Sequence, residues 1–516
     1  MPEALQLVWF KRDLRVEDHA ALHAASQRGP VLPLYIVEPD YWQLPDSSGR
    51  QWRFVRDSLH ELRETLARLG QSLVIRQGPA IEVLETLHRH HPFAAVHSHQ
   101  ETGNGWTYTR DRTVSKWLRR HAIAWQEYRQ HGVVRPLRSR DGWSRQWEEL
   151  MGEVQRPAPG ALRPIEGLDP GLIPERPPSC ATDPAEGRIA GGRGQALATL
   201  DSFLSHRGRH YSGGISSPGS AWTASSRLSP CITWGTLSLR EVVQATRERR
   251  RQVRADAAGE DQRRWLRSLR AFEERLHWHC HFMQKLEDEP RIEFGNMHRA
   301  CDGLRPEQPD PVLFHAWSRG ETGFPLVDAC MRALAAEGWL NFRMRAMLVS
   351  FAAYQLWLHW RQPALHMAQL FTDYEPGIHV CQFQMQSGTT GINALRIYNP
   401  VKQSLDQDPR GRFIRRWLPE LARVPDRWLH EPWTMPPAVQ RDTGCRLGTD
   451  YPERAVDHVQ AARLARQRFT SLRRDRSANR EADGIRERHA SRRRPAPRRR
   501  AATPASPQLG LFDGDD

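Results

Sequence analysis

Residues 373–400, DYEPGIHVCQFQMQSGTTGINALRIYNP, decide the fold of the second half of the chain. Just upstream, apolar side chains in residues 339–360 recur every three or four positions, which predicts one buried face of a helix. We expect that helix to end near Pro363, because proline disfavours the helical conformation in the residue before it. The periodicity stops at the polar turn 387–391 (SGTTG), which offers backbone N–H groups and close approach to a ligand. The stretch therefore predicts a helical domain with a ligand pocket, although a plain loop would have the same sequence.

Length and composition set broad limits on this chain. Its 516 residues are enough for at least two domains with a sizeable core. No apolar run reaches the roughly 18 residues that a membrane span needs, and the amino terminus lacks the pattern of a signal peptide. We therefore expect a cytoplasmic protein. The seven cysteines are scattered without a CxxC pair, which argues against a disulfide framework and against a metal cluster.

The net charge of +15 is concentrated near the carboxyl terminus. Residues 463–500 contain fifteen arginines and four acidic residues, so this segment alone carries a net charge of +11. A basic balance of this kind favours a nucleic-acid partner, although a solvated basic surface would give the same composition.

Residues 1–135 alternate between short apolar segments and amphipathic ones. Apolar strands separated by helices predict a parallel, doubly wound sheet, in which ligands bind beyond the carboxyl ends of the strands. No GxGxxG follows the first strand, so a dinucleotide site of that kind is not supported. We expect strands at residues 5–10, 31–37, 73–77, 94–98 and 124–128, with helices at 52–69 and 106–121.

The rest of the chain divides by composition. Residues 136–193 are a linker, with eight prolines between positions 157 and 184. Residues 194–436 form an all-helical domain, and residues 437–469 an extension that is helical toward its end. Residues 470–516, rich in Arg, Ala and Pro, are expected to be a disordered basic tail. Within the helical domain we expect helices at 196–207, 237–251, 261–285, 325–337 and 340–360.

Several long motifs resemble the photolyase/cryptochrome family. The runs ETGFPLVDACMRAL, GWLNFRMRAMLVSF, DYEPGIHVCQFQ and RIYNPVKQSLDQDPRGRFIRRWLPEL are similar to its cofactor-binding half, and LVWFKRDLRVEDHAAL to its amino terminus. The resemblance covers roughly residues 5–436 in unchanged order. It implies that FAD is held in a folded shape by the helical domain. It also implies that the α/β domain can hold a second, light-harvesting antenna chromophore, whose identity the sequence does not specify.

The resemblance extends to residues that contact FAD. The segment SSRLSPCITWGTLS (225–238) matches the family loop at the FAD phosphates, and a helix expected to begin at Pro230 would favour an anion there. A well-capped helix start would have the same sequence. Arg345 and Asp373 correspond to an ion pair beside the flavin ring, for which a purely structural pair is the alternative. The full expected set is Tyr211, Ser225, Ser226, Arg227, Leu228, Ser229, Arg345, Asp373, Tyr374 and Glu375.

The sequence departs from the family at positions near the flavin. Members that repair cyclobutane dimers carry Glu three residues before a Trp, and here Arg275 precedes Trp278. Phe342 replaces an Asn, and Met385 replaces a Trp that stacks on DNA. These four residues are our expected nucleic-acid contacts. His379 stands where the family residue facing flavin N5 is often Asn or Asp, and we expect it to act in catalysis.

The electron-transfer chain of the family is also incomplete. Of its three tryptophan positions only Trp360 matches, whereas Phe383 and Glu307 occupy the other two. Phe is much harder to oxidise than Trp, so photoreduction either is poor or uses another route, through Trp357, Trp278 or Trp339. His277 and His281 share a helix face, but no third ligand accompanies them and no metal is expected.

The resemblance implies light-driven repair of ultraviolet pyrimidine lesions in DNA, the activity of a deoxyribodipyrimidine photo-lyase. Reduced FAD would transfer an electron to a flipped-out lesion held in a cavity. A cryptochrome-like blue-light photoreceptor without repair activity is the alternative. We expect a monomer. In addition, QLGLF (508–512) resembles the short peptide by which bacterial repair and replication proteins bind the sliding clamp, with a chance tail as the alternative.

Overall fold

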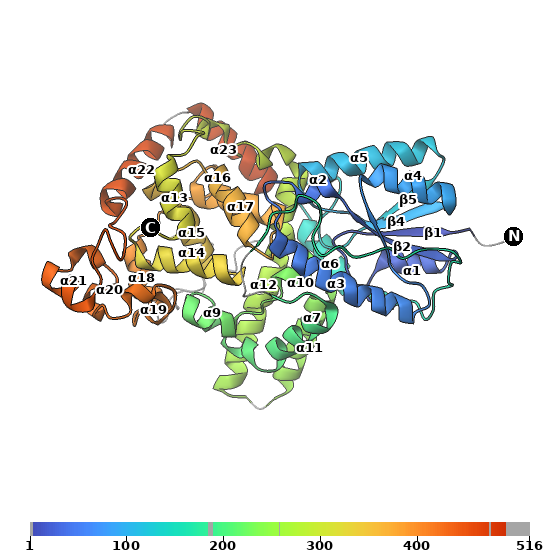
Figure 1. The fold of residues 1–516 in the computed structure, drawn as a ribbon, viewed down its shortest axis with the longest axis horizontal. Coiled ribbons are helices and arrows are strands. Elements are labelled where there is room, and N and C mark those ends of the chain that lie inside the picture. The colour runs from blue at the N-terminus through green and yellow to red at the C-terminus, as the bar shows by residue number, and fades with distance from the viewer. Residues whose placement is uncertain (1–3, 184–188, 257, 474–475, 492–516) are drawn as a thin grey trace.

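The computed structural model describes residues 4–183, 189–256, 258–473 and 476–491. An α/β domain lies at one end of the molecule and a larger helical domain at the other (Figure 1). This is the fold class that the sequence predicts. The QLGLF segment lies outside the described residues. Among the described helices, none is both long enough and apolar enough to cross a membrane.

The α/β domain is built on a five-stranded sheet with the order β3-β2-β1-β4-β5, in which all pairs are parallel. Strands β1, β2 and β4 are buried along their whole length, as expected for a sheet covered on both faces. The strands are β1 (Gln6–Phe10), β2 (Val31–Val37), β3 (Val74–Gln77), β4 (Ala95–His99) and β5 (Ala124–Tyr128). All five predicted strands are confirmed within one residue.

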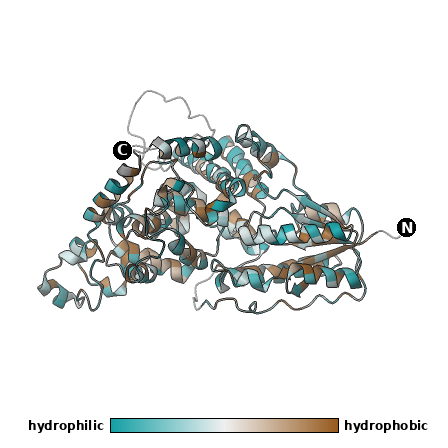
Figure 2. Ribbon diagram, turned by 90° about the horizontal axis from the view of Figure 1, so that it is seen from above, coloured by the Kyte–Doolittle hydropathy of each residue, from teal (hydrophilic) through white to brown (hydrophobic). Residues whose placement is uncertain are grey.

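Helices cover both faces of this sheet. One apolar core includes residues of α4 (Ala80–His90) and α5 (Gly105–Arg120), and the other includes residues of α1 (Ala20–Ser26) and α3 (Gly49–Arg68). The strands are coloured mostly as hydrophobic, whereas the helices carry both hydrophobic and hydrophilic residues (Figure 2). The short helix α2 (Pro39–Trp42) follows β2.

The linker is bound to the α/β domain along much of its length. Its described residues contain one helix, α6 (Trp143–Gly152), and residues 153–183 follow without regular structure. Its backbone donates from Leu162 to the carbonyl of Leu69 (2.6 Å), and the carbonyl of Pro170 accepts from Ile75 of the edge strand β3 (2.8 Å). The linker thereby covers a strand edge that would otherwise expose unpaired backbone groups.

The helical domain packs around one large apolar core. Its longest helix, α12 (Glu260–Asp288), packs against α17 (Pro376–Ser387). The other main helices are α7 (Arg193–Ser205), α11 (Leu239–Ala255), α14 (Pro325–Glu337), α15 (Phe342–Ser350) and α16 (Arg361–Leu370). Shorter ones are α8 (Tyr211–Gly214), α9 (Pro218–Ala224), α10 (Ser229–Thr233), α13 (Pro311–Arg319), α18 (Pro400–Gln407), α19 (Arg412–Trp417), α20 (Asp426–Leu429) and α21 (Pro437–Thr443).

The expected end of the helix near Pro363 was wrong. After α15 the chain forms a π-helical turn at Phe351–Gln355 and then leaves the helix, with Trp357 at a φ of 55°. A new helix, α16, starts at Arg361 and includes Pro363 in its first turn. Proline is tolerated there because the first backbone N–H groups of a helix have no intrahelical partner.

The carboxyl-terminal helices correct two further expectations. Instead of disorder from residue 470, α22 (His458–Arg473) is followed by α23 (Arg476–His489), whose Ala478, Ala482 and Ile485 are buried. These side chains recur at helical spacing, which the arginine-rich composition conceals. The two helices also pack on the polar turn 387–391, which therefore does not line the main cavity. Gly391, at a φ of 68°, lies against Ala482.

Two residues at the start of α3 join the two domains. Arg50 forms an ion pair with Asp183 (2.9 Å) and donates to the carbonyls of Leu334, Ala335 and Leu370, at the carboxyl ends of α14 and α16. Gln51 donates to the carbonyls of Ala368 (2.9 Å) and Phe371. The last carbonyls of a helix have few intrahelical donors, so these contacts supply further donors to the carboxyl ends of α14 and α16.

Candidate functional site

A cavity of about 300 Å³ opens in the helical domain, within the usual size of ligand pockets. Four segments form its walls: residues 211–233, the middle of α12, residues 339–349, and residues 367–386. The side chains that line it include Tyr211, Ser216, Ser225, Ser226, Arg227, Ser229, Arg275, Trp278, Phe282, Trp339, Asn341, Phe342, Arg345, Asp373, Tyr374, Glu375, His379, Gln382, Phe383 and Gln386. The structure thus brings together most of the residues singled out in the sequence.

The loop before α10 presents hydroxyls and a cation to the cavity. Arg207 donates to the carbonyls of Ser225 and Ser226 (3.3 Å for the latter), which fixes the path of the loop. Arg227 adopts a φ of 58°, an unusual conformation for a residue with a side chain. Helix α10 begins beside Pro230, as expected. Leu228, by contrast, is fully buried and does not line the cavity.

Arg345 and Asp373 form an ion pair on the cavity wall. A guanidinium nitrogen of Arg345 lies 2.8 Å from Oδ2 of Asp373, and its Nε donates to the carbonyl of Leu340 (2.6 Å). The second oxygen, Oδ1 of Asp373, is buried without a hydrogen-bond partner among the described residues. A buried carboxylate oxygen left in this state is costly, so it is suited to accept a hydrogen bond from a ligand.

Other buried polar atoms of the wall share this property. Ser216 Oγ, Asn341 Oδ1, Gln382 Oε1 and both polar atoms of the Gln386 side chain have no hydrogen-bond partner in the described part of the chain. Sequence reasoning missed Ser216, Gln382 and Gln386. The available signal was the spacing of the two glutamines, one helical turn apart in α17 beside His379 and Phe383. These atoms make the cavity fit for a large polar ligand such as FAD.

His379 lies in the cavity wall as a neutral imidazole. Its Nε2 is 2.8 Å from the carbonyl of Ala364, and because a carbonyl only accepts, Nε2 carries the proton. Burial lowers the pKa of His379 to about 4. Nδ1 is therefore an acceptor at neutral pH. The ring centre lies 4.6 Å from that of Phe383, which also lines the cavity.

Three of the four expected nucleic-acid contacts line the same cavity. Arg275 is hydrogen-bonded to Tyr211, whose pKa is raised by burial and lowered in part by this cation. Trp278 stacks against Phe282, with ring centres 5.7 Å apart, and Phe342 lies at the start of α15. Met385 is buried and does not line the cavity, because its position on α17 faces the interior.

The acidic segment after α16 is attached to the α/β domain. Glu375 lies 3.3 Å from the guanidinium of Arg12, which also donates to the carbonyl of Tyr374 (2.8 Å). Tyr374 donates its hydroxyl proton to Asp46 (2.7 Å). Burial raises the pKa of Glu375 to about 7 against the opposing effect of Arg12. These contacts set the position of the chain on both sides of Asp373.

Two positions of the family's electron-transfer chain, Trp360 and Glu307, lie outside the cavity lining, as does Trp357. Trp360 is buried outside the cavity lining and donates to Oδ1 of Asn296 (2.9 Å), whereas Glu307 is exposed. The guanidiniums of Arg305 and Arg468 lie 4.6 Å and 4.3 Å from the ring centre of Trp357.

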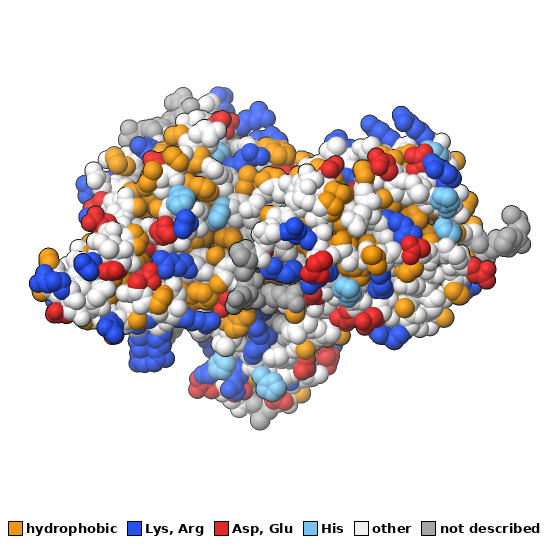
Figure 3. Space-filling model, viewed as in Figure 1, with side chains coloured by type: hydrophobic (Ala, Val, Ile, Leu, Met, Phe, Trp, Pro, Cys, Tyr) orange, Lys and Arg blue, Asp and Glu red, His pale blue; other side chains and the backbone are white. Residues whose placement is uncertain are grey.

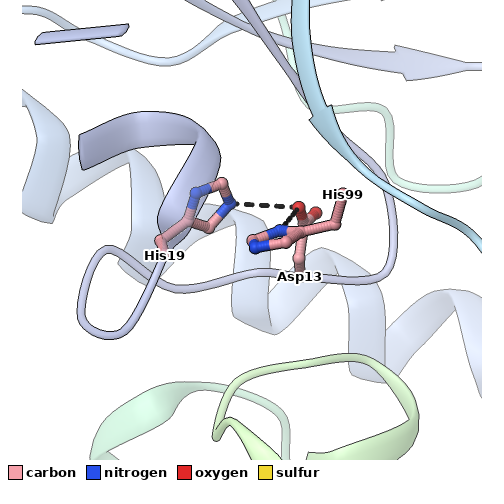
Figure 4. A group of neighbouring side chains, drawn as sticks. All are labelled: Asp13, His19 and His99. Carbon is pink, nitrogen blue, oxygen red and sulfur yellow. Dashed lines mark hydrogen bonds and ion pairs between the residues drawn. The ribbon is translucent and has the colours of Figure 1, made fainter. Parts of the chain in front are cut away.

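A histidine–carboxylate cluster lies in the α/β domain after β1 (Figure 4). Asp13 is 2.7 Å from Nδ1 of His99 and 3.0 Å from Nε2 of His19, and it accepts from the backbone N–H of Lys11. Burial alone would raise the pKa of Asp13, but the two imidazoles hold it well below its usual range. His19 also caps α1 by accepting from Leu22. The cluster therefore stabilises the turn between β1 and α1.

The surface seen in Figure 3 carries basic and acidic side chains over both domains. Side chains of both signs are interspersed there, so this face presents no single basic field.

Comparison with known proteins agrees with this geometry. Residues 272–471 match the family described as the FAD binding domain of DNA photolyase, and residues 6–143 match the DNA photolyase family. A protein of Gloeobacter violaceus named cryptochrome DASH is 30% identical over 490 residues, covering 88% of this chain and 94% of that protein. A deoxyribodipyrimidine photo-lyase of Streptomyces griseus is 29% identical over 483 residues, covering 90% of this chain and 99% of that protein.

Solved structures give the same result. The crystal structure of a bacterial class III photolyase from Agrobacterium tumefaciens superposes with a TM-score of 0.79 at 25% identity, covering 92% of this chain and 99% of that one. The similarity therefore spans both domains. The chain belongs to the photolyase/cryptochrome family.

Proposed function

We propose that this protein binds FAD in the helical cavity and uses it for light-driven repair of ultraviolet pyrimidine lesions in DNA. The observation that carries the proposal is the Arg345–Asp373 pair, whose second carboxylate oxygen is buried without a partner inside a cavity of ligand size. When bound, FAD supplies light absorption and the electron that splits the lesion. The reaction is that of a deoxyribodipyrimidine photo-lyase, as the relative in Streptomyces griseus is named.

Different residues of the cavity wall would bind different parts of FAD. The hydroxyls of Ser225, Ser226 and Ser229 and the cation of Arg227 hold the phosphates. Asp373 would accept from the flavin ring, while Arg345 holds this carboxylate in place. His379 presents Nδ1 as an acceptor, because Nε2 is committed to Ala364.

The remaining wall residues receive the lesion. A pyrimidine lesion must leave the DNA stack to reach the cavity, and Trp278 and Phe342 offer aromatic faces for it. Arg275 is a donor at a position where repairing members carry an acid. It therefore binds carbonyl oxygens of the lesion instead of its N–H groups.

A cryptochrome-like photoreceptor without repair activity is the second candidate. The observation that favours it is the replacement of the acid by Arg275 beside the cavity. The relative in Gloeobacter violaceus is named a cryptochrome. The two candidates share the FAD site and differ only in whether bound lesions are split.

One experiment separates these possibilities. Protein purified in the dark should show a flavin spectrum, and after chemical reduction it should restore oligonucleotides containing a cyclobutane dimer or a (6-4) lesion under blue light. Single-stranded and duplex substrates are compared in parallel, with unilluminated protein as control. Flavin binding with no repair of any substrate would favour the photoreceptor. Absence of flavin, even after reconstitution, would end both candidates.

We further propose that the carboxyl-terminal segment recruits the bacterial sliding clamp to a protein that acts as a cytoplasmic monomer. Leu509, Leu511 and Phe512 are apolar residues at the end of a polar, arginine-rich segment, and they are suited to fold into an apolar pocket on binding. The test is fluorescence polarisation with a peptide of residues 500–516 against a bacterial clamp. A peptide with Leu511→Ala and Phe512→Ala should not bind, and equal binding by both peptides would refute the proposal.

A further inference from the structure

Trp339 and Trp222 form a pair of tryptophan rings between the cavity and the surface. Trp339 lines the cavity and is 8% exposed. Its ring contacts that of Trp222 in α9 edge to face, with centres 5.6 Å apart and planes at 76°. Trp222 is half-buried and does not line the cavity. Two easily oxidised rings thus lead outward from the proposed FAD site.

The path through α17 offers no such pair. Phe383 is the aromatic ring at the cavity there, and a phenyl ring is far harder to oxidise than an indole. Trp360 has the ring of His359 as its neighbour, 5.7 Å away, and no tryptophan ring contacts it in the described part of the chain. The exposed position beyond it is Glu307.

We propose that Trp339 and Trp222 carry electrons into the flavin during photoreduction, an inference that rests on the FAD site proposed above. Light drives one electron from the Trp339 indole to oxidised flavin, and an electron from Trp222 then refills Trp339. The oxidised Trp222 loses its N–H proton to solvent. A small thiol in solution returns a hydrogen atom to it, and two such thiol radicals combine into a disulfide, so that electrons and protons balance.

The surroundings of Trp222 favour loss of its indole proton once the ring has been oxidised. The guanidinium of Arg227 lies 5.0 Å from the Trp222 ring centre. A cation at that distance opposes positive charge on the ring and so promotes loss of the indole proton. Proton loss holds the oxidised state at Trp222, near solvent and its reductant, and disfavours return of the electron from the flavin. Trp222 therefore reduces the flavin only indirectly, by donating an electron to Trp339, and is the residue that remains oxidised until the thiol reduces it.

The first test measures the rate at which blue light bleaches the visible flavin band of the full-length holoprotein with dithiothreitol as reductant. Trp222→Phe and Trp339→Phe should each slow bleaching by an order of magnitude or more, whereas Trp222→Tyr should restore much of the rate, because tyrosine can also be oxidised. Trp360→Phe should retain most of it. Trp428→Phe is the matched control, since Trp428 is also half-buried beneath an arginine, Arg427 at 4.1 Å, but lies outside the cavity wall.

The second test locates the radical directly. Illumination with a nitroso spin trap, followed by peptide mass spectrometry, should place a light-dependent adduct on Trp222 in the wild-type protein and remove it in Trp339→Phe. Wild-type bleaching in Trp222→Phe, or an adduct on Trp357 or Trp360 with none on Trp222, would overturn the proposal. Flavin content and thermal melting of each variant show whether a slow rate reflects a damaged site.

The test of this relay, electron transfer through Trp222 and Trp339, can be separated from the test of DNA repair. Dithionite reduces the flavin without light, so Trp222→Phe reduced in this way should repair lesions as well as the wild-type protein does. A wild-type protein that photoreduces through Trp222 but splits no lesion would retain the relay and refute repair. A protein that binds no flavin would refute both.

Discussion

The two domains hold buried charge in opposite ways. In the α/β domain the guanidinium of Arg110 contacts Glu38 (2.7 Å), Glu101 and Asp111 (2.8 Å), and it lies between the rings of Trp9 and Trp106. In the helical domain the carboxylate of Asp373 has Arg345 as its partner and keeps one oxygen without a hydrogen bond. The first network is closed and stabilises the fold, whereas the second is open toward a cavity. A structural cluster and a ligand site thus differ in whether their buried polar atoms all have hydrogen-bond partners within the protein.

The largest effect is expected from opening the closed network. Arg110→Ala would remove the cation shared by three buried carboxylates, which should cost roughly 3–5 kcal/mol of unfolding free energy. Chemical denaturation of the purified protein measures this loss. Arg89→Ala is the control, because the ion pair of Arg89 with Glu85 is exposed and should contribute nothing measurable. Equal stability of the two variants would show that the network is not structural.

A change at the Arg345–Asp373 pair should lower the affinity for FAD instead of the stability of the fold. Asp373→Ala removes the carboxylate that faces the cavity and should weaken FAD binding by roughly 1.5–3 kcal/mol, which corresponds to about ten- to a hundredfold. Titration of the flavin-free protein with FAD measures this affinity. Asp373→Asn, which keeps an acceptor oxygen, should lose less. If Arg110→Ala lowered the FAD affinity of the folded protein as much as Asp373→Ala did, the comparison between the domains would fail.

A somewhat smaller effect is expected at the aromatic wall. Trp278→Ala removes a stacking surface that should contribute roughly 1–3 kcal/mol to the binding of a flipped base. Fluorescence anisotropy with lesion-containing DNA measures the change. Met385→Ala is an informative control, because Met385 is buried away from the cavity and its loss should lower stability without changing DNA affinity. The opposite pattern would place the lesion on the other side of α17.

The smallest effect concerns pH. Burial raises the pKa of Glu38 and of Glu375 from 4.5 to about 7. A carboxyl whose pKa is higher in the folded protein stabilises the fold at low pH and loses that contribution as pH rises through the folded value. Stability of the flavin-free protein should therefore fall between pH 4.5 and about 7. Glu38→Gln and Glu375→Gln should each flatten the profile, and only the Glu375 contribution should change when FAD is added. Melting curves across this pH range provide the measurement.

The sequence predicts some parts of this fold well for physical reasons. Parallel strands covered on both faces are short, continuous apolar runs, so strands such as β2 are recognised within one residue. Helix α23 was missed because its buried side chains are mostly alanines separated by arginines, and composition alone resembles disorder. The end of α15 was misplaced because the chain leaves the helix at Trp357 through tertiary packing, without a local proline or glycine.

The site residues were predicted mainly from their resemblance to family motifs, and less from the periodicity and spacing of residues. Arg345 and Asp373 are far apart in sequence, and only the resemblance paired them before the structure placed them 2.8 Å apart. Gln382 and Gln386 were missed because their spacing is a weak signal: polar residues one turn apart more often mark the exposed face of a helix. Gln386 and the Oε1 atom of Gln382 are buried because α12 and α16 pack around α17, which single-sequence patterns do not reveal.

The contacts of Arg50 and Gln51 bear on how such proteins are assembled from parts. Neither residue lines the cavity, yet they hold the carboxyl ends of α14 and α16. Helix α16 directly precedes the segment that carries Asp373. The α/β domain therefore shapes a flavin site to which it contributes no wall. It follows that the helical half is not an independent module, because exchanging it for that of a relative would also require a matching α3.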